Sequence, residues 1–144
     1  MPASPWIGLR FGGTSVSTHD RWSTIADIAR QHRDDGARPF LVCSALSGVS
    51  DRLESLADPT SDVVHEDVLD TIRRQHLDLA DNLGLDGASI LDASFEALKV
   101  HVASAQAAGR VDPALHAEIL AMGALMSRRV VASISTSVST SPAK

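Results

Sequence analysis

Cysteine is nearly absent from this chain, since Cys43 is the only one among 144 residues. A single thiol cannot form an intrachain disulfide and cannot provide the cysteine spacing of a zinc site. Because Cys43 lies in an apolar run, we expect a buried and unreactive thiol. Dense clusters of lysine and arginine are also missing, and the formal net charge is -5. We therefore expect no surface for nucleic acid or for an acidic membrane, because both require such clusters.

Long apolar runs are missing as well. No segment approaches the roughly 18 uninterrupted apolar residues of a membrane-spanning helix. The N-terminal residues MPASPW have neither the basic nor the apolar region of a secretory signal, so the sequence predicts a cytoplasmic location. With 44% apolar and 22% charged residues, the composition is that of an ordinary soluble domain or of a piece of a larger one.

The N-terminal third of the chain has the pattern of a strand, a helix and a second strand. Residues 6–11 and 40–43 are short apolar runs, which predict two buried strands of a parallel sheet. Between them, apolar residues recur at helical spacing, with Ser17 or Thr18 as the N-cap and an end near Gly36. Such a unit places its two strands parallel to each other.

The rest of the chain is predicted to be mainly helical. Apolar residues recur at helical spacing between residues 62 and 84, and a further helix is expected over residues 88–107. Asp112 and Pro113 are typical of the N-cap and the first position of a last helix. We expect Arg128–Arg129 to lie near the C-terminus of that helix, where cations are favourable.

The C-terminal segment, from Val131 to Lys144, consists mostly of serine, threonine and small apolar residues. Its alternation of apolar and polar residues would suit a strand, whereas its composition favours a disordered tail. We therefore predict a folded unit over residues 1–130 and a disordered tail over residues 131–144.

The stretch LRFGGTSVS, residues 9–17, follows the first predicted strand. Gly12 and Gly13 would let the backbone approach a phosphate closely, and the next helix would offer free N–H groups. Arg10 would add a positive charge to the same place. A tight turn without a ligand, with a solvated Arg10, explains the pattern equally well. The stretch is neither a dinucleotide-binding G-x-G-x-x-G motif nor a P-loop.

A second loop of small residues, Ser44 to Ser50, follows the second predicted strand. Loops at the carboxyl ends of adjacent parallel strands meet at one crevice, where ligands bind, so the two loops should form one site. No histidine and carboxylate can be assigned to Ser44 as a catalytic triad. His65 and His76 flank an apolar helical stripe, and we expect them at the surface or the core edge rather than on a metal.

Three motifs resemble, in order, those of the aspartokinases, which are members of the amino acid kinase family. They are RFGGTSVS, VCSALSGVSDRL and AMGALMSRR. The family motifs run K-F-G-G-T-S-V, then V-S-A-L-S-G-[VIT]-[ST]-[DN], then G-E-L-[LM]-S-x-R. The resemblance extends from about Ile7 to Arg129, and residues 1–130 would be the N-terminal part of the kinase domain. Within the family, the sequence is most similar to the kinase part of fused aspartokinase–diaminopimelate decarboxylases.

The resemblance implies a fold and a reaction. The fold would be a three-layer α/β/α sandwich around a mostly parallel sheet. The reaction would be the phosphorylation of L-aspartate by ATP, with Mg²⁺, to 4-phospho-L-aspartate, the first step toward lysine, threonine and methionine.

The resemblance also implies a set of site residues. The nucleotide side would consist of Arg10, Phe11, Gly12, Gly13 and Thr14. Arg10 would be the catalytic cation, at the position of the family's phosphate-binding lysine, although a planar guanidinium does not replace an ammonium freely. Ser44 and Ser50 would contact aspartate. Ala124 stands on the substrate side where the family helix has a glutamate.

Family kinase domains continue past the third motif into strands that hold the nucleotide and the metal. We therefore expect a truncated kinase domain, inactive in isolation, with L-aspartate as its small-molecule partner. The alternative is a non-catalytic fragment that associates with an intact kinase or forms a homo-oligomer, because missing strands would leave apolar sheet surface exposed. A simple binding module for a phosphorylated metabolite would need only the glycine loop.

Overall fold

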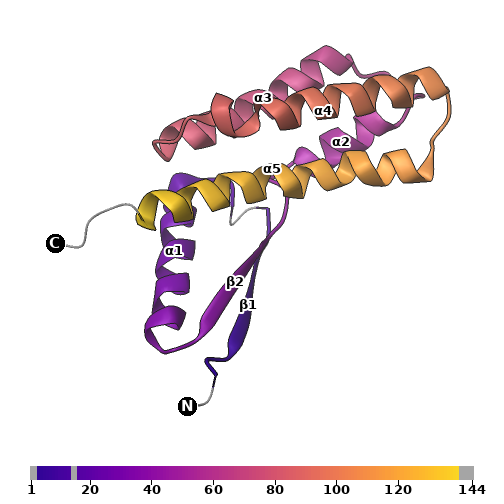
Figure 1. Ribbon diagram of the computed structural model, residues 1–144. Coiled ribbons are helices and arrows are strands. Elements are labelled where there is room, and N and C mark those ends of the chain that lie inside the picture. Colours follow the sequence, from indigo (N-terminus) through magenta and orange to yellow (C-terminus); the bar gives the residue numbers. More distant parts are fainter. Residues whose placement is uncertain (1–2, 14–15, 140–144) are drawn as a thin grey trace.

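The computed structural model describes residues 3–13 and 16–139, which form a small parallel sheet with helices (Figure 1). The elements are β1 (Trp6–Phe11), α1 (His19–Asp34), β2 (Arg38–Cys43), α2 (Val49–Ala57), α3 (His65–Asn82), α4 (Gly87–Ala108) and α5 (Pro113–Ser139). Helices α2 to α5 lie together on one side of the molecule, and the sheet with α1 extends from them. None of the helices in the described ranges is both long and apolar enough to span a membrane.

The two strands pair in parallel, as the sequence predicted. Their register runs from Trp6 opposite Arg38 to Phe11 opposite Cys43. Phe11 of β1 and Leu41 and Cys43 of β2 pack against the hydrophobic core. The strands are nevertheless not buried on both faces, because Trp6 and Phe40 on the other face are 66% and 48% exposed. An apolar run allows burial on both faces, whereas the helices of the described residues cover only one.

Helix α1 begins and ends where its sequence signals indicate. Thr18, rather than Ser17, is the N-cap, and its side chain accepts a hydrogen bond from the Arg21 amide at 3.4 Å. The helix buries Trp22 and Ile25, and the chain turns after it at Gly36 with a φ of 88°. Because this φ favours glycine, Gly36 ends the helix as expected.

Helix α2 is not predicted by the sequence pattern. It begins at Val49, directly after Gly48, whose φ is 78°. The second loop therefore ends at Gly48, and Ser50 lies in the first turn of a helix instead of in the loop. The helix buries Val49, Leu53 and Leu56, so its stability comes from tertiary packing more than from its nine residues.

The last helix, α5, starts as predicted but continues further. The Asp112 carboxylate accepts hydrogen bonds from the amides of Ala114 and Leu115, at 2.9 and 3.3 Å. The helix runs on to Ser139, so Arg128–Arg129 lie inside it and the predicted tail boundary at residue 131 is wrong. Burial of Val130 and Val131 against the core extends the helix there, and residues 140–144 lie outside the described part.

The hydrophobic core lies among the helices and contains a histidine. His76 has no exposed surface, which corrects the expectation of a surface or core-edge position. Its Nδ1 lies 2.7 Å from the Ile72 carbonyl oxygen, which accepts its hydrogen, and its ring packs edge-on against Phe95. Its Nε2 is buried without a hydrogen-bond partner. The surrounding apolar packing therefore favours the neutral imidazole.

We predict that His76 makes the fold sensitive to acid. Burial lowers the pKa of His76 below its ordinary value of 6.5, so the unfolded chain takes up a proton that the folded chain excludes. The free energy of unfolding should therefore fall as the pH drops below about 6.5 toward the lowered pKa. The measurement is thermal melting of the wild type and of His76→Gln between pH 7.5 and 5. The melting temperature of the wild type should fall more steeply, and parallel curves would contradict the prediction.

Candidate active site

The two predicted loops leave the sheet side by side. One loop follows β1 at Gly12 and the other follows β2 at Ser44. Because the strands are parallel and in register, both loops lie at the same end of the sheet, and the Ser44 amide donates to the Phe11 carbonyl at 3.1 Å. The expectation that the two loops meet is confirmed.

The hydroxyl of Ser17 joins the two loops. Its Oγ donates to the Gly13 carbonyl oxygen at 2.5 Å and accepts from the Ser47 amide at 2.9 Å. The sequence pattern indicates Ser17 only as a candidate helix cap and does not predict this role. Its position directly before the true N-cap gave no local signal of a contact 30 residues away.

The two glycines of the first loop have different surroundings. A Cβ placed on Gly13 would lie 2.8 Å from the Ala45 carbonyl oxygen, so the second loop itself excludes a side chain there. A Cβ on Gly12 would meet no described atom within 4 Å. Packing inside the protein therefore accounts for Gly13, whereas Gly12 presents open backbone that a ligand can approach.

Helix α3 holds the second loop through Gln75. The Gln75 side-chain amide donates to the Ser47 carbonyl oxygen at 3.0 Å. Its oxygen accepts from Nη1 of Arg52 at 3.3 Å. Gly48 has a φ of 78°, which favours glycine, and Nη1 at the flexible end of Arg52 would lie 2.9 Å from a Cβ there.

Helix α5 holds the start of the same loop through a buried hydroxyl. Ser127 has no exposed surface, and its Oγ donates to the Ser44 carbonyl at 2.7 Å and contacts the Ala124 carbonyl at 3.2 Å. A Cβ on Gly123 would lie 2.7 Å from the Ala45 Cβ, so the helix approaches the loop closely at a residue without a side chain. The motif AMGALMSRR therefore packs against the motif VCSALSGVSDRL.

The structure places most of the predicted site residues around these loops. Ser44 is half-buried, whereas Ser50 and Ala124 are exposed. The Ser127 hydroxyl contacts the carbonyl oxygens of both Ser44 and Ala124. Arg10 is exposed on β1 opposite Val42, on the uncovered face of the sheet, and no described residue forms an ion pair with it. Thr14 lies outside the described residues.

Cys43 ends β2 immediately before the second loop. The residue is half-buried rather than fully buried, and burial raises the pKa of its thiol above the ordinary 9.0. The thiol is therefore protonated near neutral pH, which agrees with the expected unreactive side chain.

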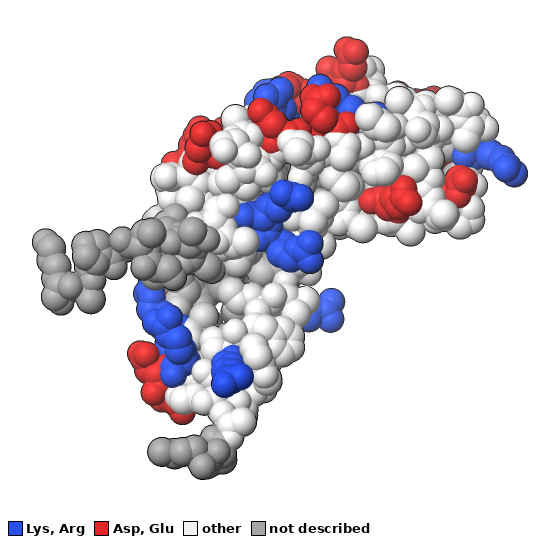
Figure 2. Space-filling view, viewed as in Figure 1, with Lys and Arg blue, Asp and Glu red and all other residues white. Residues whose placement is uncertain are grey.

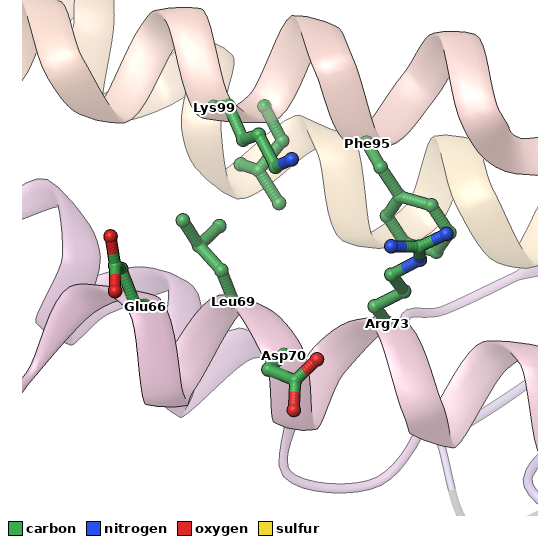
Figure 3. A pocket seen from close by; sticks show the side chains of 7 residues that line it. Glu66, Leu69, Asp70, Arg73, Phe95 and Lys99 are labelled. Carbon is green, nitrogen blue, oxygen red and sulfur yellow. The ribbon is translucent and has the colours of Figure 1, made fainter.

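A hollow of about 420 Å³ lies between α3 and α4, and none of its lining residues belongs to the two loops (Figure 3). It is lined by Glu66, Leu69, Asp70, Arg73, Phe95, Leu98 and Lys99. Lys99 pairs with Glu96 at 3.3 Å, and Arg73 lies 3.9 Å from Asp92. Figure 2 shows acidic and basic side chains mixed over these helices. Because its cations already have partners, the hollow has no unsatisfied charge to recruit an anion.

Comparison with known proteins identifies the family of this chain. Residues 9–144 match the amino acid kinase family. The chain therefore belongs to the amino acid kinase family.

Aspartate kinases are among its relatives within that family. The chain is 39% identical over 56 residues to the aspartate kinase of Pseudomonas putida, of which it covers 14%. It is 30% identical over 133 residues to the chloroplastic bifunctional aspartokinase/homoserine dehydrogenase 1 of Zea mays, again covering 14% of that protein. The crystal structure of E. coli aspartokinase III in complex with aspartate and ADP superposes with a TM-score of 0.77 at 28% identity. That match covers 91% of this chain and 28% of the E. coli chain, so the chain spans less than a third of these relatives.

We predict that the two adjacent glycines differ in their tolerance of a methyl group. Gly13→Ala should destabilise the fold by about 1–3 kcal/mol, the usual cost of overpacking, because its Cβ would meet the Ala45 carbonyl. Gly12→Ala is the matched control and should leave stability unchanged or slightly raised. Urea unfolding of the two variants measures the difference. Equal midpoints would show that the Ala45 carbonyl does not restrict Gly13.

Proposed function

We propose that this chain forms the aspartate-binding and phosphate-approach side of an aspartate kinase site. The whole site would transfer the γ-phosphoryl group of ATP to L-aspartate and form 4-phospho-L-aspartate. The observation that carries the proposal is the Ser17 hydroxyl, which contacts both the Gly13 carbonyl and the Ser47 amide and so holds the two loops together. Aspartate kinases among the relatives, including one solved with aspartate and ADP, support it.

The reaction requires positioning and charge stabilisation more than covalent help from the protein. A side-chain carboxylate oxygen of aspartate would attack the γ-phosphorus, and the bond from that phosphorus to the β–γ bridging oxygen would break, releasing ADP. The open backbone at Gly12 would lie beside the transferred group, and Arg10 would offset its charge. The hydroxyls of Ser44 and Ser50 would donate hydrogen bonds to aspartate.

The metal has no evident site in this part of the protein. Within residues 3–13 and 16–139, no three His, Cys, Asp or Glu side chains are placed to hold an ion. The described residues therefore offer no preformed three-ligand metal site, so Mg²⁺ would arrive with the phosphates of ATP and take its further ligands from water or from single carboxylates. We accordingly propose that the chain binds aspartate but does not complete the reaction by itself.

A second candidate function rests on the uncovered sheet face. Trp6 is 66% exposed, Phe40 48% and Val42 46%, which is unusual for large apolar residues on neighbouring strands. A non-catalytic fragment that packs this face against an intact kinase, or against itself, would cover them. In either case we place the protein in the cytoplasm and in the biosynthesis of lysine, threonine and methionine. The likeness to fused aspartokinase–diaminopimelate decarboxylases stays a prediction.

We predict that the chain binds L-aspartate through the second loop without turning it over. Ser50→Ala should weaken binding about 10-fold or more, because a hydrogen bond to a charged group contributes roughly 1.5–3 kcal/mol. Ser104→Ala, on an exposed part of α4, is the control and should bind normally. Isothermal titration gives the affinities, and a coupled ADP assay with Mg²⁺ and ATP should detect no aspartate-dependent turnover.

These measurements separate the candidates. Absence of aspartate binding by a folded wild type would contradict the proposed kinase side and favour the non-catalytic fragment, which gel filtration would then show as a complex or an oligomer. Turnover near 1 s⁻¹, the low end of ordinary enzyme rates, would show that the chain completes the site alone.

We also predict that aspartate binding improves when the family's glutamate is restored. Ala124→Glu should tighten binding at least about tenfold, since a charge-assisted bond to the aspartate ammonium would contribute more than 1.36 kcal/mol. Ala124 is exposed, so the longer side chain fits without rearranging the core. Ala121→Glu is the matched control, because Ala121 is exposed on the same helix one turn earlier. Equal affinities of the two variants would remove Ala124 from the substrate side.

A further inference from the structure

The peptide groups at Ser47 are held from two sides. The Ser47 amide donates to the Ser17 hydroxyl at 2.9 Å, and the Ser47 carbonyl accepts from the Gln75 side chain at 3.0 Å. Ser17 precedes α1 and Gln75 lies on α3, so segments 30 and 28 residues away fix a single loop residue. Ser47 itself is exposed, so solvent would otherwise compete for both groups.

Gln75 can hold the loop only because its own orientation is fixed. Its oxygen accepts from Arg52 of α2 at 3.3 Å, which leaves the NH₂ group directed at the loop. Its neighbours on α3, Ile72 and His76, are fully buried, so the core sets the rotation of the helix. A glutamine suits this position because its amide donates to a carbonyl and accepts from a guanidinium at the same time, which neither a carboxylate nor an ammonium can do.

The loop needs such support because of its backbone. Gly48 has a φ of 78°, and glycine is the residue with the widest choice of alternative backbone conformations. Ser44 and Ser50, the proposed aspartate contacts, lie on either side of this flexible point. A rotation at Gly48 would therefore change the separation of the two hydroxyls.

We propose that Gln75 is a positioning residue which, together with Ser17, clamps the Ser44–Gly48 loop in the conformation that binds aspartate. Gln75 does not touch the substrate and acts through the Ser47 carbonyl. The aspartate part of this inference rests on the proposed function, whereas the clamp itself is a property of the protein without ligand.

The sharpest test is Gln75→Glu in the full chain. The carboxylate keeps the shape and the acceptor for Arg52 but cannot donate to the Ser47 carbonyl, which it would repel. Gln106→Glu is the matched control, because the Gln106 amide donates to the Leu56 carbonyl at 3.1 Å, outside the two loops. We expect amide hydrogen exchange at residues 44–48 to accelerate about two- to tenfold in Gln75→Glu, the effect of one ordinary hydrogen bond. Aspartate affinity should fall by a similar factor, and Gln106→Glu should change neither.

The outcomes distinguish the clamp from the proposed function. Faster loop exchange in Gln75→Glu with a wild type that binds no aspartate would keep the clamp and overturn the aspartate assignment. Unchanged loop exchange in a folded Gln75→Glu would overturn the clamp whatever aspartate does. If circular dichroism shows that Gln75→Glu is unfolded, Ser17→Ala decides instead, because it removes the partner of the Ser47 amide from the other side. Protection at residues 44–48 equal to that of the wild type in Ser17→Ala would then reject the proposal.

Discussion

The close approach of three chain segments at Ala45 is the constraint on which the site depends. Its carbonyl would lie 2.8 Å from a Cβ on Gly13, and its own Cβ 2.7 Å from one on Gly123. Gly13 and Gly123, 110 positions apart in the sequence, thus both lack side chains because they lie close to Ala45. This contact brings the glycine loop, the serine loop and α5 into one unit. A methyl group at either glycine would separate segments that must meet for the site to exist.

Once these segments meet, their backbone polar groups need partners. Side chains supply them: Ser17 contacts Gly13 and Ser47, Ser127 contacts Ser44, and Gln75 closes the loop from α3. Each of these bonds replaces water at the peptide groups of a loop, and an unsatisfied buried group would cost more than the bond contributes. The same bonds that satisfy the loop therefore also fix its shape.

The sheet is less completely covered than the two loops. One face of β1 and β2 packs against the core, while Trp6 and Phe40 remain exposed on the other. Arg10, the proposed catalytic cation, shares that uncovered face. The two loops are thus held by hydrogen bonds and packing, whereas the strand face that presents Arg10 is uncovered in the described part of the chain.

The sequence by itself determined the local elements and the family. The strand at residues 6–11, the Asp112 cap and the stop at Gly36 depend on neighbouring residues alone, and the three motifs identify the relatives. Tertiary structure decided the rest, because it depends on contacts between distant residues. Burial of Val131 extended α5, packing formed α2, and the core enclosed His76. The roles of Ser17 and Gln75 arise from hydrogen bonds across 28 to 30 residues, and no local pattern encodes such distances.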